Sequence, residues 1–253
     1  MKTNEKNATI HVGEHALLVN NQWGEKRLAE GDKYTQTIGF KEKILNGHPF
    51  WRWNCQTEQP GVKGFPSLLY GKNPWREGGA NPENPPRSVW YIDSNWRTLL
   101  QLDLDYAARV SAEGTWNLLL DVWIVQNGKA RPEDITDEIM IVLAGTKPAW
   151  PRAVIEPIQM GQVSARTTSA YWGGRSWNAR QYRHHTGRWN CILFRIGVGH
   201  DHRLHGVLPI HECLEWCVRW CGLKGFLASV ELGTEIVSGT GTAVLERYDI
   251  EWR

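Results

Sequence analysis

Acidic residues stand inside three segments of the chain that otherwise have the pattern of strands. Asp121 interrupts an apolar run, Glu138 opens a second one, and Glu235 lies in a glycine-rich stretch. A carboxylate buried in a strand without a partner costs several kcal/mol, so each acid needs a partner or a wet cleft. Three strands that each offer an acid are the layout of a sugar-cleaving cleft. There, one carboxyl group attacks or activates water and another protonates the leaving oxygen.

The alternation of side chains along a strand indicates which side of a sheet each acid occupies. Asp121 and Trp123 point to one side of their run, while the apolar residues on either side of Asp121 point to the other. Glu138 and Met140 share a side in the second run, and isoleucines fill the opposite one. Glu235 shares its side of the strand with the glycine two residues before it. A glycine at such a position lets backbone or ligand come close. The acids are therefore expected on sheet faces opposite the core.

Tryptophan is the most frequent aromatic residue, with 15 copies against 7 tyrosines and 5 phenylalanines. Indole rings stack on sugar rings or bases over a large area with little loss of rotamer entropy. The 29 basic and 27 acidic residues nearly balance, which excludes a strongly basic nucleic-acid binder. No apolar stretch approaches the ~20 residues of a membrane span, so a membrane-spanning protein is also excluded. We therefore expect a polysaccharide or oligosaccharide partner.

Frequent glycine and proline residues divide the chain into short runs that are typical of strands. Strands are expected over His15–Asn20, Leu99–Asp105, Trp116–Val125, Glu138–Leu143, Trp189–Gly197, Phe226–Leu232 and Thr242–Ile250. Only Pro209–Leu223 has a helical period. Many strands with one helix predict an all-β protein, either a two-sheet antiparallel sandwich or a barrel. No linker or repeat divides the chain, so residues 1–253 are expected to form one domain.

The cysteines and histidines favour no metal or cofactor. Cys213, Cys217 and Cys221 lie four residues apart on one face of the expected helix, and we interpret them as buried thiols because the spacing lacks the C-x2-C of common metal motifs. Cys55 and Cys191 could pair, and nothing in the sequence decides it. The histidine cluster 200–205 lies in a loop without a paired carboxylate motif, so it is not taken as a metal site.

Six short motifs occur in order along the chain. They are N-N-Q-W-G at 20–24, P-S-L-L-Y-G-K-N-P-W at 66–75, L-D-V-W at 120–123, E-I-M-I at 138–141, G-G-R-S-W at 173–177, and G-T-E at 233–235 with S-G-T-G at 238–241. In this order they resemble glycoside hydrolase family 12, the β-jelly-roll endoglucanases and xyloglucanases. The resemblance implies a jelly-roll sandwich of two antiparallel sheets with a concave substrate cleft and one helix.

The resemblance also implies a retaining, endo-acting β-1,4-glucan hydrolase. Glu138 would be the nucleophile, Glu235 the general acid/base, and Asp121 would lie against Glu138. A retaining mechanism places its two carboxyl groups about 5–5.5 Å apart, with one ionised for attack and one protonated for leaving-group departure. A protonated Asp121 could donate a hydrogen bond to Glu138 and orient it.

Substrate-binding residues follow from the same resemblance. Trp23 matches the tryptophan that stacks on a glucosyl unit, with Asn21 as its polar neighbour. Trp75 is a second platform, and Met140 is expected close to the sugar at the cleavage point. For Trp51, Trp53, Trp90, Trp96, Trp150 and Trp172, core packing and sugar contact are equally open. The chain departs from the family pattern at Ile236, Val142 and Leu120, which leaves the acids intact but alters individual sugar subsites.

Three alternatives remain open at this stage. The enzyme could prefer xyloglucan, it could favour transglycosylation because both routes share the covalent intermediate, or the chain could be a non-catalytic β-glucan-binding jelly roll. The three matching acids argue against a pure binding module. The resemblance to the family implies a secreted monomer. Residues 1–7, however, lack the apolar core of a secretory signal.

Overall fold

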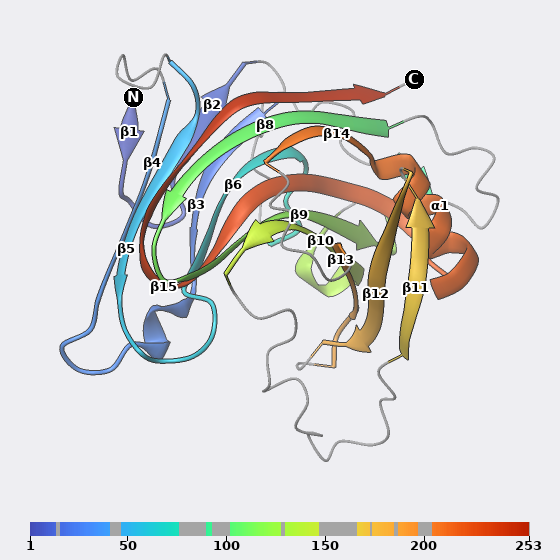
Figure 1. The fold of residues 1–253 in the computed structure, drawn as a ribbon. Helices are drawn as coiled ribbons and strands as arrows, with labels where there is room; N and C mark the ends of the chain where they lie inside the picture. Colours follow the sequence, from blue (N-terminus) through green and yellow to red (C-terminus); the bar gives the residue numbers. More distant parts are fainter. Residues whose placement is uncertain are drawn as a thin grey trace.

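The computed structural model describes residues 1–13, 16–40, 47–75, 90–92, 102–127, 130–146, 166–172, 174–184, 187–196 and 204–252. The strands form two layers that are packed face to face, with long strands that curve strongly (Figure 1). We call them the outer sheet and the site sheet. Among the described residues, no helix has the length and apolar character needed to cross a membrane.

Among the described residues, the outer sheet has six strands. Their order across the sheet is β14 (His205–Pro209), β8 (Leu102–Ala112), β15 (Gly225–Trp252), β5 (Phe50–Gln56), β4 (Lys33–Gly39) and β1 (Lys2–Thr3). Every pair in this sheet is antiparallel.

The site sheet is wider and also contains β15. Its order is β2 (Thr9–Val12), β3 (Ala16–Gln22), β6 (Gly64–Gly71), β15, β9 (Thr115–Val125), β10 (Ile135–Gly145), β13 (Asn190–Ile196), β12 (Arg175–Arg183) and β11 (Arg166–Trp172), with β7 (Trp90–Ile92) paired to the start of β15. All pairs are antiparallel except β10 with β13, which run parallel. In the described part of the chain, 3-10 turns lie at Gly24–Arg27, after β3, and at Pro132–Asp134, directly before β10.

Strand β15 connects the two layers. Its first half pairs with β6 and β9 in the site sheet, and from Gly239 onward it pairs with β5 and β8 in the outer sheet. The register of β15 against β9 shifts between Ile236 and Ser238, just before this crossing. The runs Phe226–Leu232 and Thr242–Ile250, expected as two strands, are therefore parts of one 28-residue strand.

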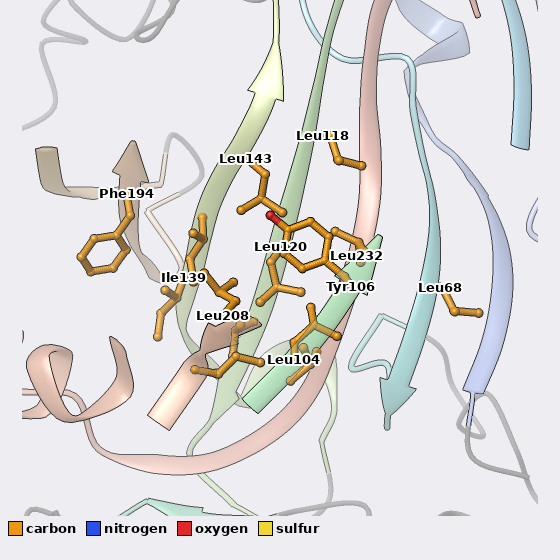
Figure 2. Close-up of a cluster of buried hydrophobic side chains, with 14 of the residues drawn as sticks. Leu68, Leu104, Tyr106, Leu118, Leu120, Ile139, Leu143, Phe194, Leu208 and Leu232 are labelled. Carbon is orange, nitrogen blue, oxygen red and sulfur yellow. The ribbon is translucent and has the colours of Figure 1, made fainter. Parts of the chain in front are cut away.

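The main core fills the space between the two sheets. Strand alternation supplies it: β9 contributes Leu118 and Leu120, β10 contributes Ile139, and β15 contributes Leu232, all of them fully or almost fully buried. Figure 2 shows these side chains converging with Tyr106 and Leu104 of the outer sheet. The opposite face of the site sheet, which we call the site face, carries the acids.

The expected helix is confirmed as α1 (Ile210–Cys221), which packs against β8 and β11 (Figure 1). Cys213 and Cys217 are buried in the main core, and Cys221 is partly buried beside it. Cys55 and Cys191 are both free thiols, Cys55 on outer-sheet strand β5 and Cys191 on site-sheet strand β13. The structure therefore shows that Cys55 and Cys191 do not form a disulfide bond with each other.

The all-β class is confirmed, with one α-helix in the described part of the chain. The remaining expected strands correspond to β3, β8, β9, β10 and β13, each with shifted ends. Trp51 and Trp53 are buried in the main core. Trp96, Trp150, His200 and His202 lie outside the described residues, as do the side chains of Trp90 and Trp172.

Candidate active site

Three adjacent strands bring the predicted acids to the site face. Asp121 on β9 lies opposite Met140 of β10 on one side and opposite Glu231 of β15 on the other. Glu138 lies two residues before Met140, and Glu235 lies four residues after Glu231, so both keep the same alternation. β9 is thus flanked by the strands of the two glutamates, with Asp121 between them.

Two donors from the β13 side hold the carboxyl group of Glu138. The indole nitrogen of Trp189 donates to Oε2 at 2.8 Å, and the thiol of Cys191 donates to the same oxygen at 3.3 Å. Cys191 is the direct partner of Glu138 in the parallel pair of β10 and β13. Trp189 lies two positions earlier and therefore points to the same face. The half-buried Glu138 is thereby fixed in orientation.

Aromatic rings surround Trp189. The rings of Trp75, Trp123 and Trp189 meet edge to face, with centroid distances between 5.1 and 5.9 Å. The imidazole of His184 stacks on Trp189 at 4.0 Å with an interplanar angle of 13°. Edge-to-face pairs and stacking each favour a fixed ring orientation. The Trp189 N–H is therefore held in the direction of Glu138.

Glu235 is held from the other side of β9. Asn117, its cross-strand partner, donates from Nδ2 to Glu235 Oε2 at 3.2 Å. Arg195 of β13 in turn donates to the side-chain oxygen of Asn117 at 3.4 Å. This second contact orients the amide so that its nitrogen faces Glu235. Burial lowers the pKa of Arg195, and the charge of Glu235 opposes that effect.

Asp121 is the most enclosed of the three predicted acids. Its side chain is 5 % exposed, and burial raises its pKa well above the usual range. The negative charges of Glu138, Glu231 and Glu235 raise it further. The raised pKa favours the neutral acid, which can act as a hydrogen-bond donor. The Oδ1 atom of Asp121 is buried without a hydrogen-bond partner, and a hydrogen bond from Asp121 to Glu138 stays a prediction.

Glu231 is a fourth acid at the site. It is almost fully buried and accepts hydrogen bonds from Ser67 at 3.1 Å and from Ser229 at 3.2 Å. Because it lies directly opposite Asp121, the two carboxyl groups interact electrostatically. Glu231 shares the alternation of Glu235 along β15, but nothing in the sequence marks the two serines as its partners.

The two glutamates lie on opposite sides of β9 at different positions along it. Glu138 is opposite Trp123, and Glu235 is opposite Asn117. Both charges act on Asp121 and also raise the pKa of Tyr182. A carboxyl separation of about 5–5.5 Å stays a prediction.

The predicted substrate-binding residues are spread along the site sheet. Trp23 follows β3 and is 45 % exposed, and Trp75 follows β6 and is 38 % exposed. Backbone contacts through Lys63 connect Trp23 to Ile236, beside Glu235. Met140 is half-buried opposite Asp121. Asn21 is half-buried on β3 with the alternation of the site face.

Sequence reasoning missed the residues that hold the glutamates. Trp189 and Cys191 were assigned no site role, because their contact with Glu138 depends on the parallel pairing of β10 with β13. Asn117 had a usable signal, since it shares the alternation of Asp121 along β9. Arg195 had none, because it reaches across β10 to Asn117.

Comparisons with known proteins agree with the motif pattern. No protein-family model matches the chain. The curated endoglucanase S of Pectobacterium parmentieri is 27 % identical over 241 residues, covering 93 % of this chain and 80 % of the relative.

Two solved structures have the same fold. A family 12 xyloglucanase from Bacillus licheniformis in complex with ligand superimposes with a TM-score of 0.78 at 23 % identity, covering all of both chains. The xyloglucanase domain of NopAA from Sinorhizobium fredii, in complex with cellobiose, gives 0.66 at 16 % identity, covering 100 % of this chain and 99 % of that one. With the motifs, the relative and the fold in agreement, the resemblance of this chain to glycoside hydrolase family 12 is confirmed.

Proposed function

We propose that this glycoside hydrolase cleaves β-1,4-linked glucan chains internally and with retention of configuration. Glu138 attacks the anomeric carbon, and Glu235 protonates the departing oxygen and later activates water. The observation that carries the proposal is the placement of these two acids on strands that flank β9. The negative charges of both acids raise the pKa of Asp121, which lies on β9. The protein is expected to act as a secreted monomer without a metal or cofactor.

The surroundings of Glu138 and Asp121 support their assigned roles. Glu138 accepts hydrogen bonds from Trp189 and Cys191, and donors of this kind favour the ionised form that a nucleophile requires. Burial and acidic neighbours raise the pKa of Asp121, which favours a neutral form that can donate to Glu138 without adding a second negative charge. The acids form one electrostatic cluster, so the apparent pKa values of activity belong to the group.

The test is the release of reducing ends from β-glucan by the wild type and by two isosteric variants. Glu138→Gln and Glu235→Gln should each lower turnover by about a thousandfold or more while the melting temperature changes little. Glu246→Gln is the matched control, because Glu246 pairs with Arg109 in the outer sheet. Wild-type turnover in either active-site variant would refute the assignment, and a wild type that binds glucan without cleaving it would indicate a binding module.

Xyloglucan is a second candidate substrate. Both structural neighbours described above are xyloglucanases by name, and the chain carries the small Val142 where the family often has an aromatic residue. A panel of cellulose derivative, mixed-linkage glucan and xyloglucan, with product length followed over time, separates the candidates. Early products of medium length indicate endo-cleavage, and products longer than the substrate at high oligosaccharide concentration indicate transglycosylation.

A further inference from the structure

We propose that Trp189 and Cys191 are positioning residues that fix the orientation of the Glu138 carboxyl group through its Oε2 atom. This inference rests on the proposed function, in which Glu138 is the nucleophile. Both residues come from the β13 side, and both donate to the same oxygen, at 2.8 Å and 3.3 Å. Two donors to one oxygen restrict the rotation of the carboxyl group.

The backbone of this region makes the arrangement specific. In the parallel pair of β10 and β13, Glu138 is the register partner of Cys191, so the two side chains emerge side by side. One residue earlier, Asn190 donates to Asp137 at 3.0 Å. That bond fixes the register by a contact between neighbouring side chains on these strands. A slip of one residue would turn Cys191 to the core.

The indole N–H of Trp189 is aimed by its neighbours. Stacking on His184 and edge contacts with Trp75 and Trp123 surround the ring, which is only 5 % exposed. An acceptor stabilises a buried indole N–H, and Glu138 is the acceptor found here. The aromatic cluster therefore acts on Glu138 through a single hydrogen bond rather than through packing alone.

The thiol of Cys191 stays protonated and can remain a donor. Burial raises its pKa, and the charge of Glu138 raises it further. Tyr182, the cross-strand partner of Cys191, acts in the opposite sense and lowers the pKa of the thiol to a smaller extent. The Cys191 thiol thus remains a neutral donor, which suits an ionised acceptor.

The test compares Trp189→Phe, Cys191→Ala and Cys191→Ser by steady-state kinetics on a β-glucan oligosaccharide. Trp189→Phe keeps an aromatic ring but removes a donor to a charged group, so kcat should fall about ten- to a hundredfold with little change in KM. Cys191→Ala should lower kcat about threefold, because a thiol is a weak donor. Cys191→Ser restores a donor and should recover most of that loss.

The pH profile is a readout that a purely structural role would not move. Losing a donor destabilises the ionised carboxylate, so the acid limb of kcat/KM should shift to higher pH in Trp189→Phe. The other titratable groups around Glu138 are Asp121 from β9, Glu231 and Glu235 from β15, Tyr182 from β12, Cys191 from β13 and the adjacent His184. All of them remain in this variant, so the shift reports the lost bond.

Trp177→Phe and Cys217→Ala are the matched controls, since they alter a tryptophan and a thiol that are buried in the main core. They should leave kcat and the acid limb unchanged, with any loss confined to melting temperature. Wild-type kcat and an unmoved acid limb in Trp189→Phe and Cys191→Ala would overturn the inference. If the wild type itself releases no reducing ends, or Glu138→Gln remains active, the proposed function fails instead.

Discussion

Asp121 combines two properties at the scale of a single residue. It is buried on the site face, and three other acids surround it. Burying a charge there is costly, so the folded protein favours the neutral acid. The native state therefore binds this proton more tightly than the unfolded chain does.

This proton affinity has a consequence for stability. Because the folded-state pKa of Asp121 is raised, its contribution to stability is fully present below the ordinary aspartate pKa and is lost as pH rises through the raised value. Asp121→Asn removes this dependence. The melting temperature of Asp121→Asn relative to the wild type should therefore increase as pH rises from 4 to about 8. A difference that is constant over this range would show that Asp121 is ionised in the folded protein.

The residues of the candidate site differ in how far the sequence predicts them. Asp121, Glu138 and Glu235 stand out because an acid in an apolar or glycine-rich strand is costly unless it has a purpose. Trp189 and Cys191 do not stand out, because a tryptophan and a cysteine are ordinary in a buried strand. Their contact with Glu138 depends on which strand lies beside β10, and local patterns carry no such information.

At the scale of elements, the passage of β15 between the sheets depends on Gly239. Its φ is +90°, and an added Cβ atom would overlap the carbonyl oxygen of Glu113. Gly222 ends α1 in the left-handed conformation at φ +70°, but open space surrounds its missing side chain. The two glycines thus share a positive φ and differ in the room around them.

This contrast predicts the outcome of two alanine substitutions. Gly222→Ala should lower the free energy of unfolding by about 1 kcal/mol, the backbone cost alone. Gly239→Ala should cost about 3 kcal/mol or more, since the overlap with Glu113 adds to the backbone strain. Urea denaturation of both variants measures the difference. Equal losses would mean that the chain relaxes at the crossing without disturbing either sheet.

The sequence predicts the elements unevenly for a related reason. β9 and β10 have long apolar runs with clear alternation, and both were expected. β4 and β12 are rich in polar residues and were missed, although both pair along their full length. The polar runs become strands because neighbouring strands supply their hydrogen bonds. β15 was divided in two because its glycines look like turn signals.

At the scale of the whole molecule, none of the five cysteines, all of which lie within the described residues, forms a disulfide bond. Four of them are buried and Cys221 is partly exposed. Burial raises the pKa of the Cys55, Cys191 and Cys217 thiols, which keeps the reactive thiolate scarce. The fold therefore holds together without a covalent crosslink.

Thiol titration checks this prediction. The native protein should show at most one rapidly reacting thiol, and five should react in denaturant. Adding a reducing agent should leave the melting temperature unchanged. Three thiols in denaturant, with a melting temperature that falls on reduction, would reveal a disulfide instead.

The position of β15 between β6 and β9 in one layer, and between β5 and β8 in the other, also affects biosynthesis. A nascent chain that has left the ribosome only as far as Leu223 holds two incomplete layers. Both have unpaired strand edges, which are templates for aggregation. Neither layer can close until the 28 residues of β15 emerge. Translation of β15 is therefore the step at which chaperone protection matters most for the yield of folded protein.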